Sequence, residues 1–201
     1  SLVGSEMCIR DRSITGVNSK LIQPRTAKTV GAQSGRTRNK AEVFTPSWMC
    51  NTQNNLIDTQ WFGRSGVFNT EREAGWVTNN EPVDFTGAKG GWHQYIDAKR
   101  MEVSCGEAPY MVSRYDTVTG QRIPLHDRIG ILDRKLRIVG ESAASDEEWL
   151  KWSRRAVESV YAFEYQGDSL LLARENILYS YIEYYSVSYT HLRAHETRHD
   201  L

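Results

Sequence analysis

The chain has 201 residues, of which 39% are hydrophobic and 25% charged, a balance typical of a soluble globular protein. Its 25 Lys and Arg equal its 25 Asp and Glu, so net charge does not distinguish nucleic-acid partners from others. The sequence has neither an apolar run of the roughly 20 residues needed to cross a bilayer nor a secretory signal, which predicts a cytoplasmic protein with no membrane partner. Its three cysteines form no CxxC pair, so we expect reduced thiols.

The N-terminal region divides into two segments. Residues 1–12 resemble translated sequencing-adaptor DNA, as do residues 186–201 at the other end, and we expect both to be foreign to the fold. Residues 13–40 carry six basic and no acidic side chains, with several glycines and serines, which predicts a flexible basic arm. Such an arm could follow DNA phosphates or could be a solvated segment with no ligand.

A helix is predicted after the arm. Thr45 places a capping residue before Pro46, a proline suited to the first helical position, and residues 47–61 then form the helix, closed by Gly63. Residues 63–94 show no helical or strand period and are rich in Gly, Asn and Thr. They are predicted to form a long loop.

The middle of the chain predicts a strand, a turn and a helix. Residues 100–105 form a short strand that ends at Gly106, and the apolar residues 110–112 can begin a helix. Residues 116–125 are rich in turn formers. Residues 129–139 are compatible with either a helix or a strand.

The C-terminal half carries the clearest helix signal. Ser145 and Glu148 form a capping box, and an apolar face follows at Trp149, Trp152, Ala156 and Val160. Both tryptophans are therefore expected in the core.

Residues 160–164 predict a second strand, and residues 170–185 predict a further helix. The alternation of helices and strands predicts an α/β fold, a partial Rossmann-like layer of parallel sheet with flanking helices.

Two acidic residues lie near the carboxyl ends of the predicted strands, Glu102 in the first and Glu164 after the second. Ligands of open parallel sheets bind beyond these ends, where turns and helix N-termini present backbone N–H groups. A carboxylate after the second strand could accept hydrogen bonds from both ribose hydroxyls of a nucleoside cofactor. An ordinary tight turn with a surface glutamate would have the same pattern.

Three segments, in this order, resemble gamma-type adenine-N6 DNA methyltransferases. AEVFTP at 41–46 resembles their F-T-P motif, and MEVSCGEAPYM at 101–111 resembles their glycine motif D-P-A-C-G-S-G-x-F-L. VYAFEYQGDSLLLARENIL at 160–178 is similar to the next element, a strand ending in an acid and a helix containing L-A-R-x-N-L. Residues 41–185 are therefore identified as the N-terminal part of such a domain, similar to the methylase subunits of restriction systems.

The resemblance implies S-adenosylmethionine as cofactor, and double-stranded DNA and restriction-system subunits as partners. It implies that Phe44, Thr45 and Pro46 line the cofactor pocket. It also implies that the turn with Glu102, Ser104 and Gly106 contacts the cofactor and that Glu164 holds the ribose. The chain departs from the motif at two positions, with Glu102 in place of Asp and Ala108 in place of the second Gly.

The family holds its flipped adenine with an N-P-P-Y type motif. The five prolines of this chain are never adjacent, so the sequence has no such motif and no predicted catalytic residue. This predicts a fragment that does not itself methylate DNA. An alternative is a non-catalytic α/β interaction domain of a restriction system.

A third interpretation rests on the C-terminal residues. His195, Glu196 and His199 match the H-E-x-x-H pattern of zinc hydrolases, in which both histidines share one helix face. The pattern lies inside the adaptor-like segment, so we predict no metal site.

Overall fold

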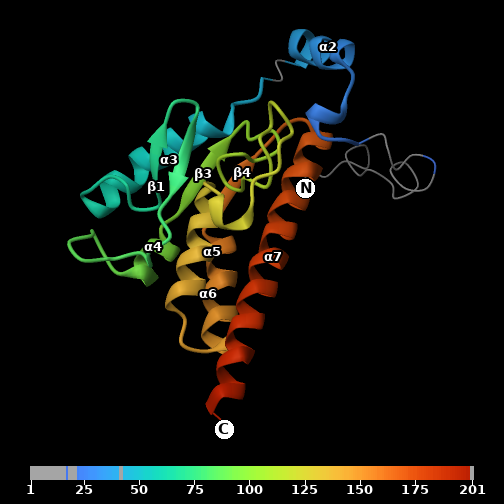
Figure 1. Ribbon diagram of the computed structural model, residues 1–201. Coiled ribbons are helices and arrows are strands. Elements are labelled where there is room, and N and C mark those ends of the chain that lie inside the picture. The colour runs from blue at the N-terminus through green and yellow to red at the C-terminus, as the bar shows by residue number, and fades with distance from the viewer. Residues whose placement is uncertain (1–16, 18–21, 41–42, 200–201) are drawn as a thin grey trace, which may run out of the picture.

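The computed structural model describes residues 17, 22–40 and 43–199, with the backbone alone at 39–40 and 189–199 (Figure 1). In chain order the helices and strands are η2 (Arg25–Ala27), α2 (Val30–Lys40), α3 (Ser47–Phe62), β1 (Asn69–Arg72), β2 (Gly75–Thr78), α4 (Trp92–Asp97), β3 (Arg100–Val103), η3 (Leu125–Asp127), α5 (Ile131–Ser142), α6 (Asp146–Glu158), β4 (Val160–Phe163) and α7 (Gly167–His199).

The two strands predicted around the glycine turn pair in parallel. Arg100 of β3 lies opposite Val160 of β4, and Val103 lies opposite Phe163. Helices α5, α6 and α7 run alongside one another beside this sheet, and α6 contacts β4 (Figure 1). The predicted mixed α/β class and the parallel strand pair are therefore confirmed, with two strands in this sheet among the described residues.

Two helix predictions are confirmed, each with one of its end signals. The predicted start signal of α3 is wrong, because Pro46 and not Thr45 is the N-cap residue, and it forms no side-chain capping hydrogen bond. Helix α3 ends at Gly63, whose φ of 67° suits glycine and whose N–H donates to the carbonyl of Thr59 at 3.0 Å. Ser145 caps α6, because its Oγ accepts the N–H of Glu148 at 3.2 Å. The Glu148 carboxylate in turn accepts the N–H of Ala144 at 2.8 Å.

Two further predictions of the sequence analysis are wrong. Residues 63–94 contain the antiparallel hairpin of β1 and β2, whose strands have four residues each and turn at Ala74 with φ 52°. Strands this short and this exposed leave little alternation to detect. The predicted helix at 110–112 is a turn, because Gly106 and Ala108 have positive φ and hold the chain out of helical geometry just before it. The ambiguous residues 129–139 belong largely to helix α5.

Two elements extend into the terminal segments. Helix α2 occupies the end of the predicted basic arm, and α7 continues through the adaptor-like residues to His199. Residues 1–12 lie outside the described part, as do the side chains of the H-E-x-x-H pattern, so the foreign origin of both segments stays a prediction. Within the described ranges, no helix combines the length and apolar character that crossing a bilayer requires.

The main core lies between α3, α4, α5 and α6. Trp149 is 2% exposed and packs in this cluster, while Trp152 lies partly buried against it, as the helical spacing predicted. The core also encloses an ion pair, since the guanidinium of Arg134 on α5 contacts the carboxylate of Asp58 on α3. Tyr95 donates its hydroxyl to the same carboxylate at 2.7 Å.

Candidate functional site

The turn after β3 has an unusual backbone. Ser104, Gly106 and Ala108 have φ values of 55°, 55° and 61°, in the left-handed region that favours glycine. Two of these residues carry a Cβ, so the turn holds strain that the surrounding contacts must offset. The turn lies at the carboxyl end of the parallel sheet, where sheets of this kind present backbone N–H groups to ligands.

Glu164 is bound to this turn. Its Oε2 accepts the N–H of Gly106 at 2.7 Å, and its Oε1 accepts the N–H of Gln166 at 2.8 Å. A carboxylate offers about four acceptor positions, so two remain for other donors. Glu164 is half-buried, and the two backbone bonds fix its orientation without using its full capacity.

Phe44 packs on the same turn from a distant part of the chain. A Cβ added to Gly106 would lie 3.2 Å from Cε1 of Phe44, so the glycine lets the ring approach closely. The segment after Phe44 is held by two further bonds. Thr117 donates its hydroxyl to the carbonyl of Thr45 at 3.0 Å, and Asp116 accepts the N–H of Ser47 at 2.7 Å.

Glu102 lines a cavity that contains no other predicted site residue. The cavity has a volume of about 260 Å³ and is also lined by Asn54, Arg100 and Tyr110. Burial raises the pKa of Glu102 to about 8, against the lowering effect of the backbone N–H groups of Tyr110 and Met111. Its Oε2 is buried and has no hydrogen-bond partner among the described residues. Burial therefore favours the protonated, neutral form of Glu102 near pH 7.

Residues from the N-terminal arm also lie against the turn. The N–H of Arg25 donates to Glu107 at 2.8 Å, and the Arg25 guanidinium lies 5.5 Å from the ring centroid of Phe44. Farther along, Arg36 and Lys28 form ion pairs with Asp168 at the start of α7. Basic residues of the arm thus contact the same edge of the molecule as the candidate site.

The structure brings together some of the predicted site residues and separates others. Phe44, Gly106 and Glu164 meet at the turn, and Ser104 is exposed in it. Pro46 instead lines a neighbouring cavity of about 820 Å³. Glu102 lines its own cavity, which shares no lining residue with the cavity at Pro46.

The sequence analysis missed one buried group in the turn. Glu107 is 2% exposed, and its carboxylate accepts the hydroxyl of Tyr115 at 2.5 Å. Asn176 of α7 donates to both the Glu107 carbonyl and the Tyr115 hydroxyl at 3.1 Å. No local pattern could have revealed this group, because two of its partners, Arg25 and Asn176, lie 82 and 69 residues away in sequence.

Cysteine and metal chemistry find little support here. Cys50 and Cys105 are free and buried, and burial raises the pKa of each thiol to about 12, which opposes formation of a thiolate nucleophile. Within the part of the chain that the structure describes, no three His, Cys, Asp or Glu side chains gather in a metal-binding group.

No protein-family model, no curated protein and no solved structure matches this chain.

Proposed function

We propose that the chain carries the S-adenosylmethionine-binding part of a site-specific DNA adenine-N6 methyltransferase of a restriction-modification or phage-defence system. The observation that supports it is the meeting of three separated motifs, in which Phe44 packs on Gly106 and Glu164 accepts the Gly106 N–H. On this proposal the parallel β3 and β4 belong to a Rossmann-like sheet. An α/β fold alone would not carry the proposal, because such folds serve many functions.

The residues at the turn fit the nucleoside part of such a cofactor. Glu164 keeps free acceptor positions suited to a pair of ribose hydroxyls. Phe44 offers an apolar wall against the turn. Glu102 lines a separate cavity and burial favours its neutral form, so we assign it no contact with the ammonium group. When bound, S-adenosylmethionine would supply an electrophilic methyl group on its sulfonium. Our proposal assigns binding and orientation of that cofactor to this chain.

The adenine half of such a site has no counterpart in the sequence, which lacks adjacent prolines and hence an N-P-P-Y motif. Positioning supplies a large part of the acceleration of group-transfer reactions. We therefore expect no transfer of labelled methyl groups to adenine-rich duplex DNA above a no-protein control. Incorporation by the purified chain would contradict this part of the proposal.

Calorimetric titration with S-adenosylmethionine tests cofactor binding. Glu164→Ala should weaken binding by about 1.5–3 kcal/mol, the usual loss for hydrogen bonds to a charged acceptor. Glu175→Ala is a matched control, because Glu175 is exposed on α7 and should leave the affinity unchanged. Glu164→Gln keeps an acceptor for the Gly106 N–H and should fall between the two. Absence of binding by the wild-type chain, or equal affinities throughout, would overturn the proposal.

One observation favours the alternative, a non-catalytic interaction domain. Met101, Val103, Tyr161 and Phe163 are 41–65% exposed and form one apolar face of the β3–β4 sheet. Parallel sheets are normally covered on both faces. If the chain is such a domain, Val103→Ser should abolish association with a partner subunit, and S-adenosylmethionine should produce no heat on titration.

A further inference from the structure

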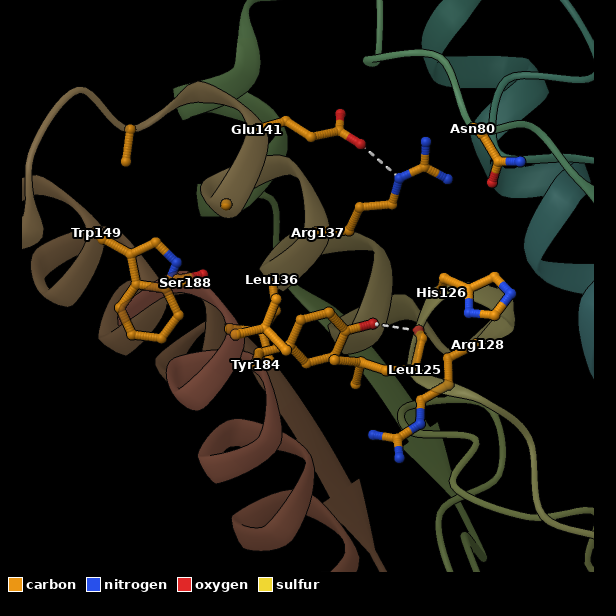
Figure 2. A pocket seen from close by; sticks show the side chains of 13 residues that line it. Asn80, Leu125, His126, Arg128, Leu136, Arg137, Glu141, Trp149, Tyr184 and Ser188 are labelled. Carbon is orange, nitrogen blue, oxygen red and sulfur yellow. Dashed lines mark hydrogen bonds and ion pairs between the residues drawn. The ribbon is translucent and has the colours of Figure 1, made fainter. Parts of the chain in front are cut away.

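A second cavity lies away from the glycine turn and contains none of the residues assigned to the cofactor. It has a volume of about 760 Å³ and opens between α5, α6, α7 and the 3-10 helix η3 (Figure 2). Pockets of about 300–1,000 Å³ commonly hold small organic ligands. Leu136, Trp149 and Tyr184 supply apolar walls, and Figure 2 shows Leu136 and Tyr184 near the centre of the view and Trp149 at its left.

Two residues that line this cavity carry buried hydrogen-bond donors without acceptors. Trp149 is 2% exposed, and its indole Nε1 has no partner among the described residues. The side chain of Arg128 is 6% exposed, and although its terminal nitrogens reach Glu183 and Ser180, its Nε has no partner in the same part of the chain. An unpaired buried donor costs roughly 1–3 kcal/mol, so a ligand with an acceptor group would relieve a cost already present.

The opposite side of the cavity is polar. Arg137 and Glu141 form an ion pair there, and the exposed ring of His126 lies beside them (Figure 2). The cavity thus combines an apolar interior, unpaired donors and a cationic rim residue. Apart from Val187 and Ser188, which belong to the adaptor-like segment, its lining comes from residues 80–184.

We propose that this cavity binds a small amphipathic anion, an apolar ring system or short chain that carries one carboxylate or sulfonate group. The apolar body would lie against Trp149 and Tyr184. The acid group would accept hydrogen bonds from donors of the cavity, which has unpaired donors but only one carboxylate among its lining side chains. The proposal is independent of cofactor binding at the glycine turn.

Gly140 offers a way to close the cavity without breaking the fold. A Cβ at this position would lie 3.4 Å from Oγ of Ser188 and 4.0 Å from Nε1 of Trp149, so a larger side chain would project toward the cavity wall. Gly140 is inside helix α5 and exposed, so replacing it should not strain the backbone. Residues other than glycine are favoured inside helices.

The test is a fluorescence titration of the full chain with the aromatic anion 8-anilinonaphthalene-1-sulfonate. The wild-type chain should bind one equivalent. Gly140→Leu should weaken binding at least about tenfold, because the leucine side chain occupies the space of the ligand. It should not lower the melting temperature, because leucine is favoured over glycine inside a helix. Trp149→Phe keeps an aromatic side chain but removes the indole N–H. It should weaken binding about fivefold, the effect of one hydrogen bond. Trp152→Phe is the matched control on the same helix, and binding should not change.

Two results would overturn the proposal. The first is equal binding by the wild-type chain and Gly140→Leu, which would show that the dye does not occupy the cavity. The second is loss of binding in Val103→Ser, which would place the dye on the exposed face of the β3–β4 sheet instead.

Discussion

The glycine turn and the α3–α5 interface are built from different kinds of contact. At the turn, Glu164 and Gly106 are partly accessible, and side chains bind backbone N–H groups. At the interface, Arg134 and Asp58 are 1% and 4% exposed and are paired with each other inside the core. Polar groups at the turn stay partly accessible to solvent, whereas those at the interface are buried and bond to one another. A motif resemblance can therefore select residues that meet at one edge of the sheet without indicating what stabilises the fold that carries them.

The polar interface extends beyond one ion pair. The second terminal nitrogen of Arg134 donates to Asn51 at 2.8 Å and to Asn55 at 2.9 Å. Asn51 and Asn69 exchange amide hydrogen bonds at 2.8 and 2.9 Å, which ties β1 to α3. Removing one member of this network leaves other polar groups buried without partners.

The largest expected effect is therefore at the interface. Arg134→Met should lower the free energy of unfolding by about 3–5 kcal/mol, because it leaves the buried Asp58 carboxylate without its cationic partner. Urea denaturation would measure it. Arg137→Met, which removes a more accessible pair with Glu141, should cost no more than about 1 kcal/mol. Similar losses in the two variants would erase the contrast between interface and surface.

The next largest effect is at the turn. Gly106→Ala should cost about 1–2 kcal/mol, because alanine is disfavoured at φ 55° and its Cβ would approach the ring of Phe44 at 3.2 Å. Gly35→Ala is the control, since a Cβ there meets nothing within 4 Å. Thermal unfolding compares the two. A neutral Gly106→Ala would mean that the turn does not need its left-handed residue.

A pH dependence tests a third group, Glu102, which lines a cavity of its own. The pKa of Glu102 is raised from 4.5 to about 8, so the folded state favours the protonated acid. Its contribution to stability is complete below pH 4.5 and is lost as pH rises to about 8. Glu102→Gln should remove this loss from about pH 4.5 to 8. It should keep the loss between about pH 4 and 6 that comes from Asp133, whose pKa burial raises to about 6.

Chemical denaturation at several pH values checks this behaviour. Lys135 acts in the opposite direction at higher pH, because burial lowers its pKa from 10.5 to about 7 and its contribution grows as pH rises through that range. Measurements between pH 5 and 7 therefore isolate the acids. Identical curves for the wild type and Glu102→Gln in that window would contradict the burial of a protonated Glu102.

The smallest effect is expected where the arm meets the edge. Asp168→Asn removes the ion pairs with Arg36 and Lys28, which are partly exposed, so the loss should not exceed about 1 kcal/mol. The sharper readout is limited trypsin digestion, which should cleave faster within 28–40 in the variant. Glu175→Ala provides the control, and unchanged cleavage in Asp168→Asn would show that these pairs do not hold the arm.

Local signals explain which parts of the fold were predictable. Gly63 ended α3 and Ser145 began α6 through contacts within a few residues, and both were predicted from sequence. The hairpin of β1 and β2 was missed, because four-residue strands carry almost no periodicity. The network around Arg134 was also missed, since its partners lie more than 70 residues away.

At the candidate site, too, residues in motifs could be predicted and long-range contacts could not. The residues Phe44, Gly106 and Glu164 were chosen from motif resemblance, and they meet in the structure, although their role in cofactor binding stays a proposal. The Glu107 contacts to Arg25 and Asn176 had no sequence signal, because they depend on how distant segments pack.

Amide shifts on titration with S-adenosylmethionine test the central claim most directly. In ¹H–¹⁵N spectra of the full chain, the N–H signals of Gly106 and Gln166 should shift first, because both donate to the carboxylate proposed to hold the ribose. The indole N–H of Trp149 lies in the other cavity and should stay in place. Shifts at Trp149 with none at Gly106 and Gln166, or no shifts at saturating cofactor, would contradict the account.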